Sequence, residues 1–97
     1  MVTGKTKTGF EWSVDERIVK DYRYVRALAK LNRSHGAEKF IAFDQISTLM
    51  LGDKVDALIS HVEGLNDGYA PIEAIGAEVT EIIGALTPKN SISSQES

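Results

Sequence analysis

The strongest constraint on the fold is the helical spacing of apolar residues, which is cleanest near the C-terminal end of the chain. From Pro71 to about Leu86, apolar side chains recur every three or four positions, and glutamates occupy positions between them. This spacing places the apolar residues on one face of an amphipathic helix. That face comprises Ile72, Ile75, Val79, Ile82, Ile83 and Leu86.

Two further segments show apolar residues at helical spacing. Residues 37–51 are apolar over a wide arc, which predicts the most buried helix, and Gly52 suits a left-handed cap at its C-terminal end. Residues 53–63 carry a regular apolar stripe, with Asp53 placed to cap the helix and Gly64 to end it. The wide arc of the first segment comprises Phe40, Ile41, Phe43, Ile46, Leu49 and Met50.

The connection to the last helix contains turn residues. Asn66, Asp67 and Gly68 are typical of a turn, and Pro71 suits a first helical position because no hydrogen bond is required of its nitrogen there. Gly76 lies inside this helix, where glycine costs about 1 kcal/mol relative to alanine. It indicates close approach by a neighbouring backbone.

The first predicted helix covers residues 15–33. Ser13 and Glu16 have the spacing of a capping box. Asp21 faces the apolar stripe in this phase, so a later start of the helix at Asp21 stays open. The stripe comprises Ile18, Tyr22, Val25, Leu28 and Ala29.

Residues 8–14 alternate between apolar and polar side chains, with Phe10, Trp12 and Val14 on one side. Alternation of this kind is typical of a half-buried strand, and no other segment of the sequence reads as one. An isolated strand leaves its backbone groups unpaired, so the segment can lie on the helices, fold into a small hairpin, or pair with another chain. Core packing is the favoured interpretation of its three apolar residues.

The chain length and these patterns predict one small, mainly α domain of four helices with a short N-terminal arm or hairpin. We expect residues 1–9 to be a flexible N-terminus, 10–86 to form the helical domain, and the serine-rich residues 87–97 to be a disordered tail.

Several chemistries lack the residues they require. The chain has no cysteine, which excludes disulfides, thiolate catalysis and cysteine-based metal sites. Neither His35 nor His61 has a partner at metal-ligand spacing on its own segment, and no nucleophile motif or phosphate-binding loop is present. We therefore expect no catalytic residues, no metal, no cofactor and no enzymatic activity. Without an apolar signal segment or membrane span, a cytoplasmic protein is the expectation.

Charge is unevenly distributed along the chain. Residues 1–48 hold nine lysines or arginines against six acidic residues, and residues 49–97 hold two against eight, so the two parts carry +3 and −6. In the first part, Arg23, Arg26, Lys30 and Arg33 gather on one side of the predicted helix near Tyr22 and Tyr24. Such a face is able to grip phosphates or stack bases, although a solvated face is the favoured interpretation in an acidic chain.

The order of motifs resembles the small tail assembly chaperones of long-tailed phages and prophages of Gram-positive hosts. The similarity is carried by GFEWSVDERIVKDYRYVRALAKL, the joint LMLGD and HVEGLNDGYAPIEAIGAEVTEIIGAL, and covers residues 9–86. It implies a non-enzymatic protein of the host cytoplasm that binds and solubilises the tape measure protein, recruits tail tube protein, self-associates, and is absent from the mature virion. A longer form produced by ribosomal frameshifting is also typical of the family.

The resulting hypothesis has two parts. Amphipathic helices, notably residues 37–51, lend apolar surface to tape measure helices, and the arm pairs between copies. The residues proposed to bind partners are Phe10, Trp12, Val14, Arg23, Arg26 and Lys30. Two alternatives stay open: a small nucleic-acid-binding regulator that uses the basic face, and a helical adaptor domain that recognises one small partner.

Overall fold

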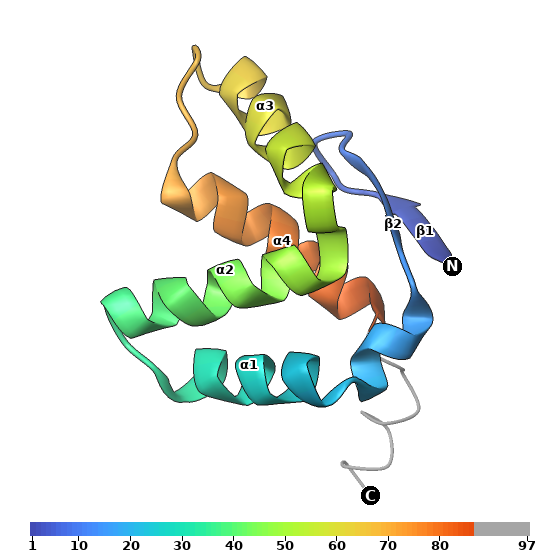
Figure 1. Cartoon of the computed structure of the whole chain (residues 1–97). Coiled ribbons are helices and arrows are strands. Elements are labelled where there is room, and N and C mark those ends of the chain that lie inside the picture. Colours follow the sequence, from blue (N-terminus) through green and yellow to red (C-terminus); the bar gives the residue numbers. More distant parts are fainter. Residues whose placement is uncertain (87–97) are drawn as a thin grey trace, which may run out of the picture.

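A computed structural model describes residues 1–86 and shows a mainly helical domain with a two-stranded N-terminal hairpin (Figure 1). This architecture confirms the predicted fold class, and the predicted tail at residues 87–97 lies outside the described residues. The elements are β1 (Val2–Lys5), β2 (Glu11–Val14), the 3-10 turn η1 (Glu16–Lys20), α1 (Tyr22–Arg33), α2 (Ala37–Leu51), the 3-10 turn η2 (Gly52–Lys54), α3 (Val55–Leu65) and α4 (Ile72–Leu86).

The N-terminal hairpin is antiparallel, with Val2 opposite Val14 and Lys5 opposite Glu11. Its turn is closed by a bond from the Thr6 N–H to the Phe10 carbonyl, at 2.9 Å. Of the three arrangements considered for residues 8–14, the hairpin is the one that forms, and it lies along the helices (Figure 1). The expectation of a flexible segment at residues 1–9 is wrong, because Val2–Lys5 supply the partner strand.

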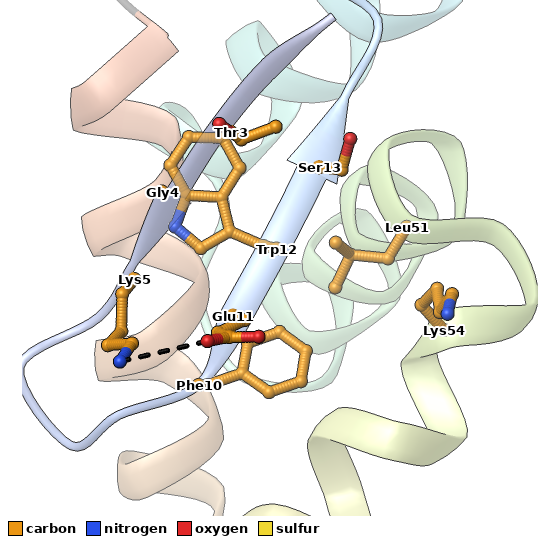
Figure 2. Close-up of a pocket in the computed structure, with 9 residues that line it drawn as sticks. All are labelled: Thr3, Gly4, Lys5, Phe10, Glu11, Trp12, Ser13, Leu51 and Lys54. Carbon is orange, nitrogen blue, oxygen red and sulfur yellow. Dashed lines mark ion pairs between the residues drawn. The ribbon is translucent and has the colours of Figure 1, made fainter.

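Gly4 and Trp12 face each other across this hairpin, and the indole ring lies over β1 (Figure 2). A Cβ atom built at Gly4 would come within 2.6 Å of Trp12 Cζ2. Only glycine therefore leaves room for the indole ring at this position of β1. The absence of a side chain at Gly4 also removes the alternation by which β1 could be recognised in the sequence.

Residues 16–33 form two helical segments instead of one continuous helix. The Asp15 carboxylate accepts a bond from the Arg17 N–H at the start of η1, and the Asp21 carboxylate accepts one from the Arg23 N–H at the start of α1. The later start at Asp21 is thus correct, and the predicted capping box of Ser13 and Glu16 is wrong.

The break at Asp21 also explains an error in the predicted buried face of α1. The stripe was phased from Ile18, which belongs to η1, so it does not describe the helix that follows. Tyr24 and Ala27 are buried in α1, whereas Tyr22 and Val25 are exposed. Burial raises the pKa of the Tyr24 phenol.

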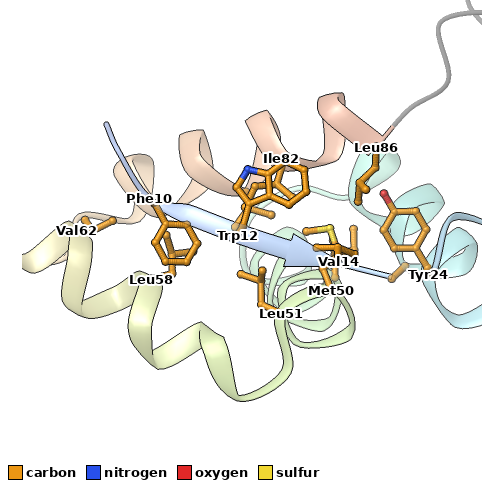
Figure 3. Packing of buried hydrophobic residues seen from close by; sticks show 13 residues of the cluster. Phe10, Trp12, Val14, Tyr24, Met50, Leu51, Leu58, Val62, Ile82 and Leu86 are labelled. Carbon is orange, nitrogen blue, oxygen red and sulfur yellow. The ribbon is translucent and has the colours of Figure 1, made fainter. Parts of the chain in front are cut away.

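The core lies between the hairpin and the four α-helices (Figure 3). Phe10 faces the side of Leu58 and Val62, and Val14 lies toward Met50 in the same view. The buried apolar cluster comprises Phe10, Trp12, Val14, Tyr24, Ala27, Ile46, Met50, Leu51, Leu58, Val62, Val79, Ile82 and Leu86. Every α-helix and one strand thus contribute to one continuous core.

The joint between α2 and α3 differs in detail from the prediction. Gly52 has φ 57° and ψ −128°, so glycine is required, but the conformation is not a left-handed helical cap. The prediction that Asp53 caps the next helix is wrong, because η2 intervenes and Lys54 precedes α3. Gly64 lies inside α3, one residue before its end at Leu65.

The turn between α3 and α4 follows the prediction. Asp67 and Gly68 have φ values of 59° and 82°, as expected for the Asn-Asp-Gly signal. The Pro71 carbonyl accepts bonds from Ala74 and Ile75, so the proline lies just before α4, one position earlier than its predicted place as the first helical residue. No helix within residues 1–86 has both the length and the apolar character needed to cross a membrane.

Candidate functional site

The three arm residues proposed to bind partners are part of the core. Phe10 and Trp12 are each 7% exposed and Val14 is more deeply buried, so the structure agrees with their favoured interpretation as core residues. A concavity of about 540 Å³ does lie on the outer side of the hairpin (Figure 2). Its lining combines apolar and polar side chains, and it includes the Lys5–Glu11 ion pair at 3.7 Å.

The hairpin is also fastened to the helices through its turn. The Thr8 hydroxyl donates to Glu78 Oε2 at 2.7 Å and lies 2.9 Å from His61 Nε2. The same hydroxyl therefore bridges His61 on α3 and Glu78 on α4. Glu81 adds a second link by accepting from the Lys7 N–H at 3.0 Å.

Glu78 is the most unusual member of this polar network. Its side chain is buried, and Oε1 has no hydrogen-bond partner among residues 1–86. A buried carboxylate with one satisfied oxygen depends strongly on the bond it does make. The Thr8 hydroxyl therefore couples the hairpin turn to α3 and α4, and the network holds the arm against its own domain.

The three proposed basic residues come together on one side of α1. Arg23, Arg26 and Lys30 line a concavity of about 490 Å³, and we call it the basic concavity. Its other lining residues are Tyr22, Ala27, Gln45, Thr48 and Leu49, so α2 forms its second wall. Arg33, the fourth cation of the predicted basic face, does not line it.

Arg23 is partly neutralised at the edge of the basic concavity. Its Nη2 lies 2.8 Å from Asp21 Oδ2, and its Nε donates to Asp21 Oδ1 at 3.0 Å. This pairing lowers the pKa of Asp21 to about 2 and raises that of Arg23. Arg17 lowers the pKa of Asp15 to about 2 in the same way, at a pair that lies in η1.

An apolar groove on the opposite flank of α2 was not identified from the sequence. Two concavities, of about 450 and 510 Å³, lie side by side and share Phe40, Phe43 and Ile72 in their lining, and we call the pair the apolar groove. Leu28, Leu31, Gly76, Thr80 and Ile83 line one end, and Ser47, Val55, Leu58, Ile59, Ala70 and Ile75 line the other.

Large apolar side chains at the apolar groove are open to solvent. Phe40 is 50% exposed and Ile72 is 57% exposed, although helix periodicity predicts both to be core residues. The first turn of α2, from Ala37 to Ile41, is exposed throughout. The prediction of a deeply buried helix therefore applies to the C-terminal half of α2, where Ile46, Met50 and Leu51 are buried.

Gly76 forms part of the floor of the apolar groove. A Cβ atom built there would meet Phe43 Cζ at 3.7 Å, which is an ordinary contact with a side chain. The predicted close approach of a neighbouring backbone is therefore wrong. Glycine at this position instead leaves the space over the Phe43 ring open.

Charged groups stand around the apolar groove. Lys39 and Glu73 line one end, and Asp44 lines the other. The lining thus combines apolar side chains from all four α-helices with a few charges of both signs. Recognition grooves for amphipathic helices commonly have this arrangement.

The described part of the chain holds no group of three or more His, Cys, Asp or Glu side chains able to bind a metal ion. Comparisons with protein families, with curated proteins and with solved structures find no match to this chain.

Proposed function

We propose that this chain is a phage tail assembly chaperone that holds amphipathic helical segments of the tape measure protein in the apolar groove. The observation that carries the proposal is the exposure of Phe40 on α2 and Ile72 on α4, which line both concavities of the groove. An incoming helix that covers these side chains removes apolar surface of both proteins from water. The resemblance to tail assembly chaperones supplies the identity of the partner.

The groove is suited to a partner of variable sequence. Phe40 and Phe43 present aromatic rings, and the lining contains few polar groups that would demand a matching donor or acceptor. Apolar contact without many directional bonds tolerates different side chains at the same position of a bound helix. A chaperone of a long helical protein has to bind many such segments.

The remaining parts of the proposal follow from the resemblance alone. They are the recruitment of tail tube protein, self-association, action in the host cytoplasm and absence from the mature virion. An adaptor domain that recognises one small helical partner would use the same groove. The two functions differ in whether the chain keeps a large apolar helical protein soluble.

The test is co-expression with the tape measure protein encoded by the same phage or prophage. We expect a larger soluble fraction of the tape measure protein and its co-purification with the chain. Gly76→Leu should abolish both effects, because the added side chain enters the groove above Phe43. Gly84→Leu is the matched control, since a Cβ atom at Gly84 meets no other atom within 4 Å in the described structure.

The outcomes test the chaperone function and its assignment to the apolar groove separately. If the wild-type chain neither solubilises nor binds the tape measure protein, the chaperone proposal is wrong. If it does both and Gly76→Leu behaves like Gly84→Leu, the chaperone function stands and the groove is not its site. Both substitutions replace glycine within α4 by a stronger helix former, so loss of the helix would not explain a difference.

A further inference from the structure

The basic concavity is a second surface, separate from the apolar groove. On α2, Gln45, Thr48 and Leu49 face the basic concavity, whereas Phe40, Phe43 and Ser47 face the groove. At 3.6 residues per turn, these two sets lie on nearly opposite flanks of the helix. A ligand in one depression therefore leaves the other accessible.

Positive charge in the basic concavity is left largely uncompensated. Among residues 1–86, no aspartate or glutamate lines it, and no carboxylate lies within ion-pair distance of Arg26 or Lys30. Asp44, the acidic residue nearest in sequence on the facing wall, lines the apolar groove instead. Within residues 1–86, Asp21 is thus the acidic residue that pairs with a cation of this concavity, and it does so through Arg23 alone.

The other lining residues favour a polypeptide ligand. Ala27 and Leu49 provide apolar contacts, Gln45 and Thr48 offer side-chain hydrogen bonds, and Tyr22 is 74% exposed at the edge. Two unpaired cations provide few phosphate contacts, whereas nucleic-acid binding commonly depends on about 6 to 10 of them.

We propose that the basic concavity binds an acidic segment of a partner polypeptide, with carboxylates of that segment paired to Arg26 and Lys30. Arg23 remains bonded to Asp21 and contributes less to the ligand. Because the site lies on the flank of α2 opposite the apolar groove, the domain can hold an acidic segment and an apolar helix at the same time. This inference does not depend on the identity of the protein that occupies the groove.

The experiment measures binding of a fluorescent oligo-glutamate peptide to the full chain by anisotropy, beside a short DNA duplex with the same label. We expect the peptide to bind more tightly than the duplex and to be released as salt is raised. The double variant Arg26→Glu, Lys30→Glu should weaken peptide binding by about tenfold or more, equivalent to about 1.4 kcal/mol. Gly76→Leu should leave peptide binding unchanged.

The matched control is Lys20→Glu, Arg33→Glu, which changes the net charge by the same amount at exposed positions outside the concavity. We expect it to weaken peptide binding less than twofold. Equal losses in the two double variants would assign binding to overall charge and overturn the site. Tighter binding of the duplex than of the peptide would replace the proposal with a nucleic-acid site. Absence of peptide binding by the wild-type chain would also overturn it.

Discussion

Two pairs of aromatic residues have opposite fates in this domain. Phe10 and Trp12 precede the first helix in an arm that could have been a binding surface, and they are buried. Phe40 and Phe43 lie in the helix predicted to be most buried, and they line an open groove. The difference lies in what covers each pair, because β1 and the helices close over the first and no described element closes over the second.

This comparison shows what apolar periodicity measures. A period of 2 or 3.6 identifies which side chains share a face, but it does not identify which face meets the domain's own core. On α2, apolar residues occupy more than one face, and the domain buries the face that includes Ile46 and Met50. Phe43 lies at the edge of that face and is partly buried against the core, whereas Phe40, one turn earlier, is half exposed and is available to another molecule.

The largest expected effect comes from truncating one aromatic residue of each pair. Trp12→Ala should lower the free energy of unfolding by about 3 to 5 kcal/mol, because it removes a buried indole from the core. Phe40→Ala should change it by no more than about 1 kcal/mol, because half of that side chain is already in water. Urea denaturation of both variants measures the difference. Equal losses would show that the groove aromatics are as important to the core as the hairpin aromatics.

A second test addresses the fit between the strands. Gly4→Ala should destabilise the domain by about 1 to 3 kcal/mol, since the new methyl group must displace the Trp12 ring. In a Trp12→Leu background, the same substitution should cost much less, because the smaller side chain leaves the space open. Additive losses in this double-mutant cycle, measured by denaturation, would contradict the contact between the two positions.

The turn of the hairpin gives a third test. Thr8→Val should lower the free energy of unfolding by about 1 to 3 kcal/mol, because it removes the hydroxyl donor from a buried carboxylate. Thr8→Ser keeps the hydroxyl and should retain most of the stability. If valine and serine behave alike in thermal denaturation, the Thr8–Glu78 hydrogen bond does not fasten the hairpin.

Most of the helices could be predicted from the sequence, because their stripes are long and their end signals are strong. The end of α2 at Leu51 and the turn at Asp67 and Gly68 agree with the pattern. β1 could not be predicted, because its four residues include a glycine that carries no pattern and exists to accommodate Trp12. The only sequence signal for the break between η1 and α1 is the charged residue Asp21 on the predicted apolar stripe.

The candidate site was less accessible to sequence reasoning than the fold. Arg23, Arg26 and Lys30 were grouped correctly, because three cations at helical spacing share a face wherever the helix packs. The apolar groove was missed as a site, because it depends on the distance between α2 and α4. The spacing of apolar residues along the sequence does not determine that distance. The wide apolar arc of residues 37–51 is one sequence signal for such a surface, and Gly76 is a second, although close backbone packing was predicted there and the structure has a side-chain contact with Phe43.

A fourth test sharpens the contrast between Gly4, which lies against Trp12, and Gly76, which lies against Phe43. Gly76→Ala should raise the free energy of unfolding by up to about 1 kcal/mol, because alanine favours the helix and its methyl group fits against Phe43. Gly84→Ala should give a similar gain, since its surroundings are open. Destabilisation by Gly76→Ala alone, in the same urea titration, would show that the groove is closed in solution.

The smallest expected effect concerns an exposed ion pair, between Asp21 and Arg23, at the start of α1. Arg23 lowers the pKa of this carboxylate from 3.8 to about 2, so the folded state holds the proton less tightly than the unfolded chain. The associated stability is therefore fully present above about pH 4, and it is lost as the pH falls toward 2. Because the pair is exposed, its contribution is small and decreases with salt.

Asp21→Asn isolates this contribution, because the amide oxygen can still accept the Arg23 N–H while the charge is removed. Thermal denaturation between pH 5 and pH 2 should show a slightly shallower fall of Tm in the variant than in the wild-type chain. Parallel curves would mean that Arg23 does not hold Asp21 in solution. In that case Arg23 would be free to join Arg26 and Lys30 as a third unpaired cation, and the basic concavity would be more strongly charged than the structure indicates.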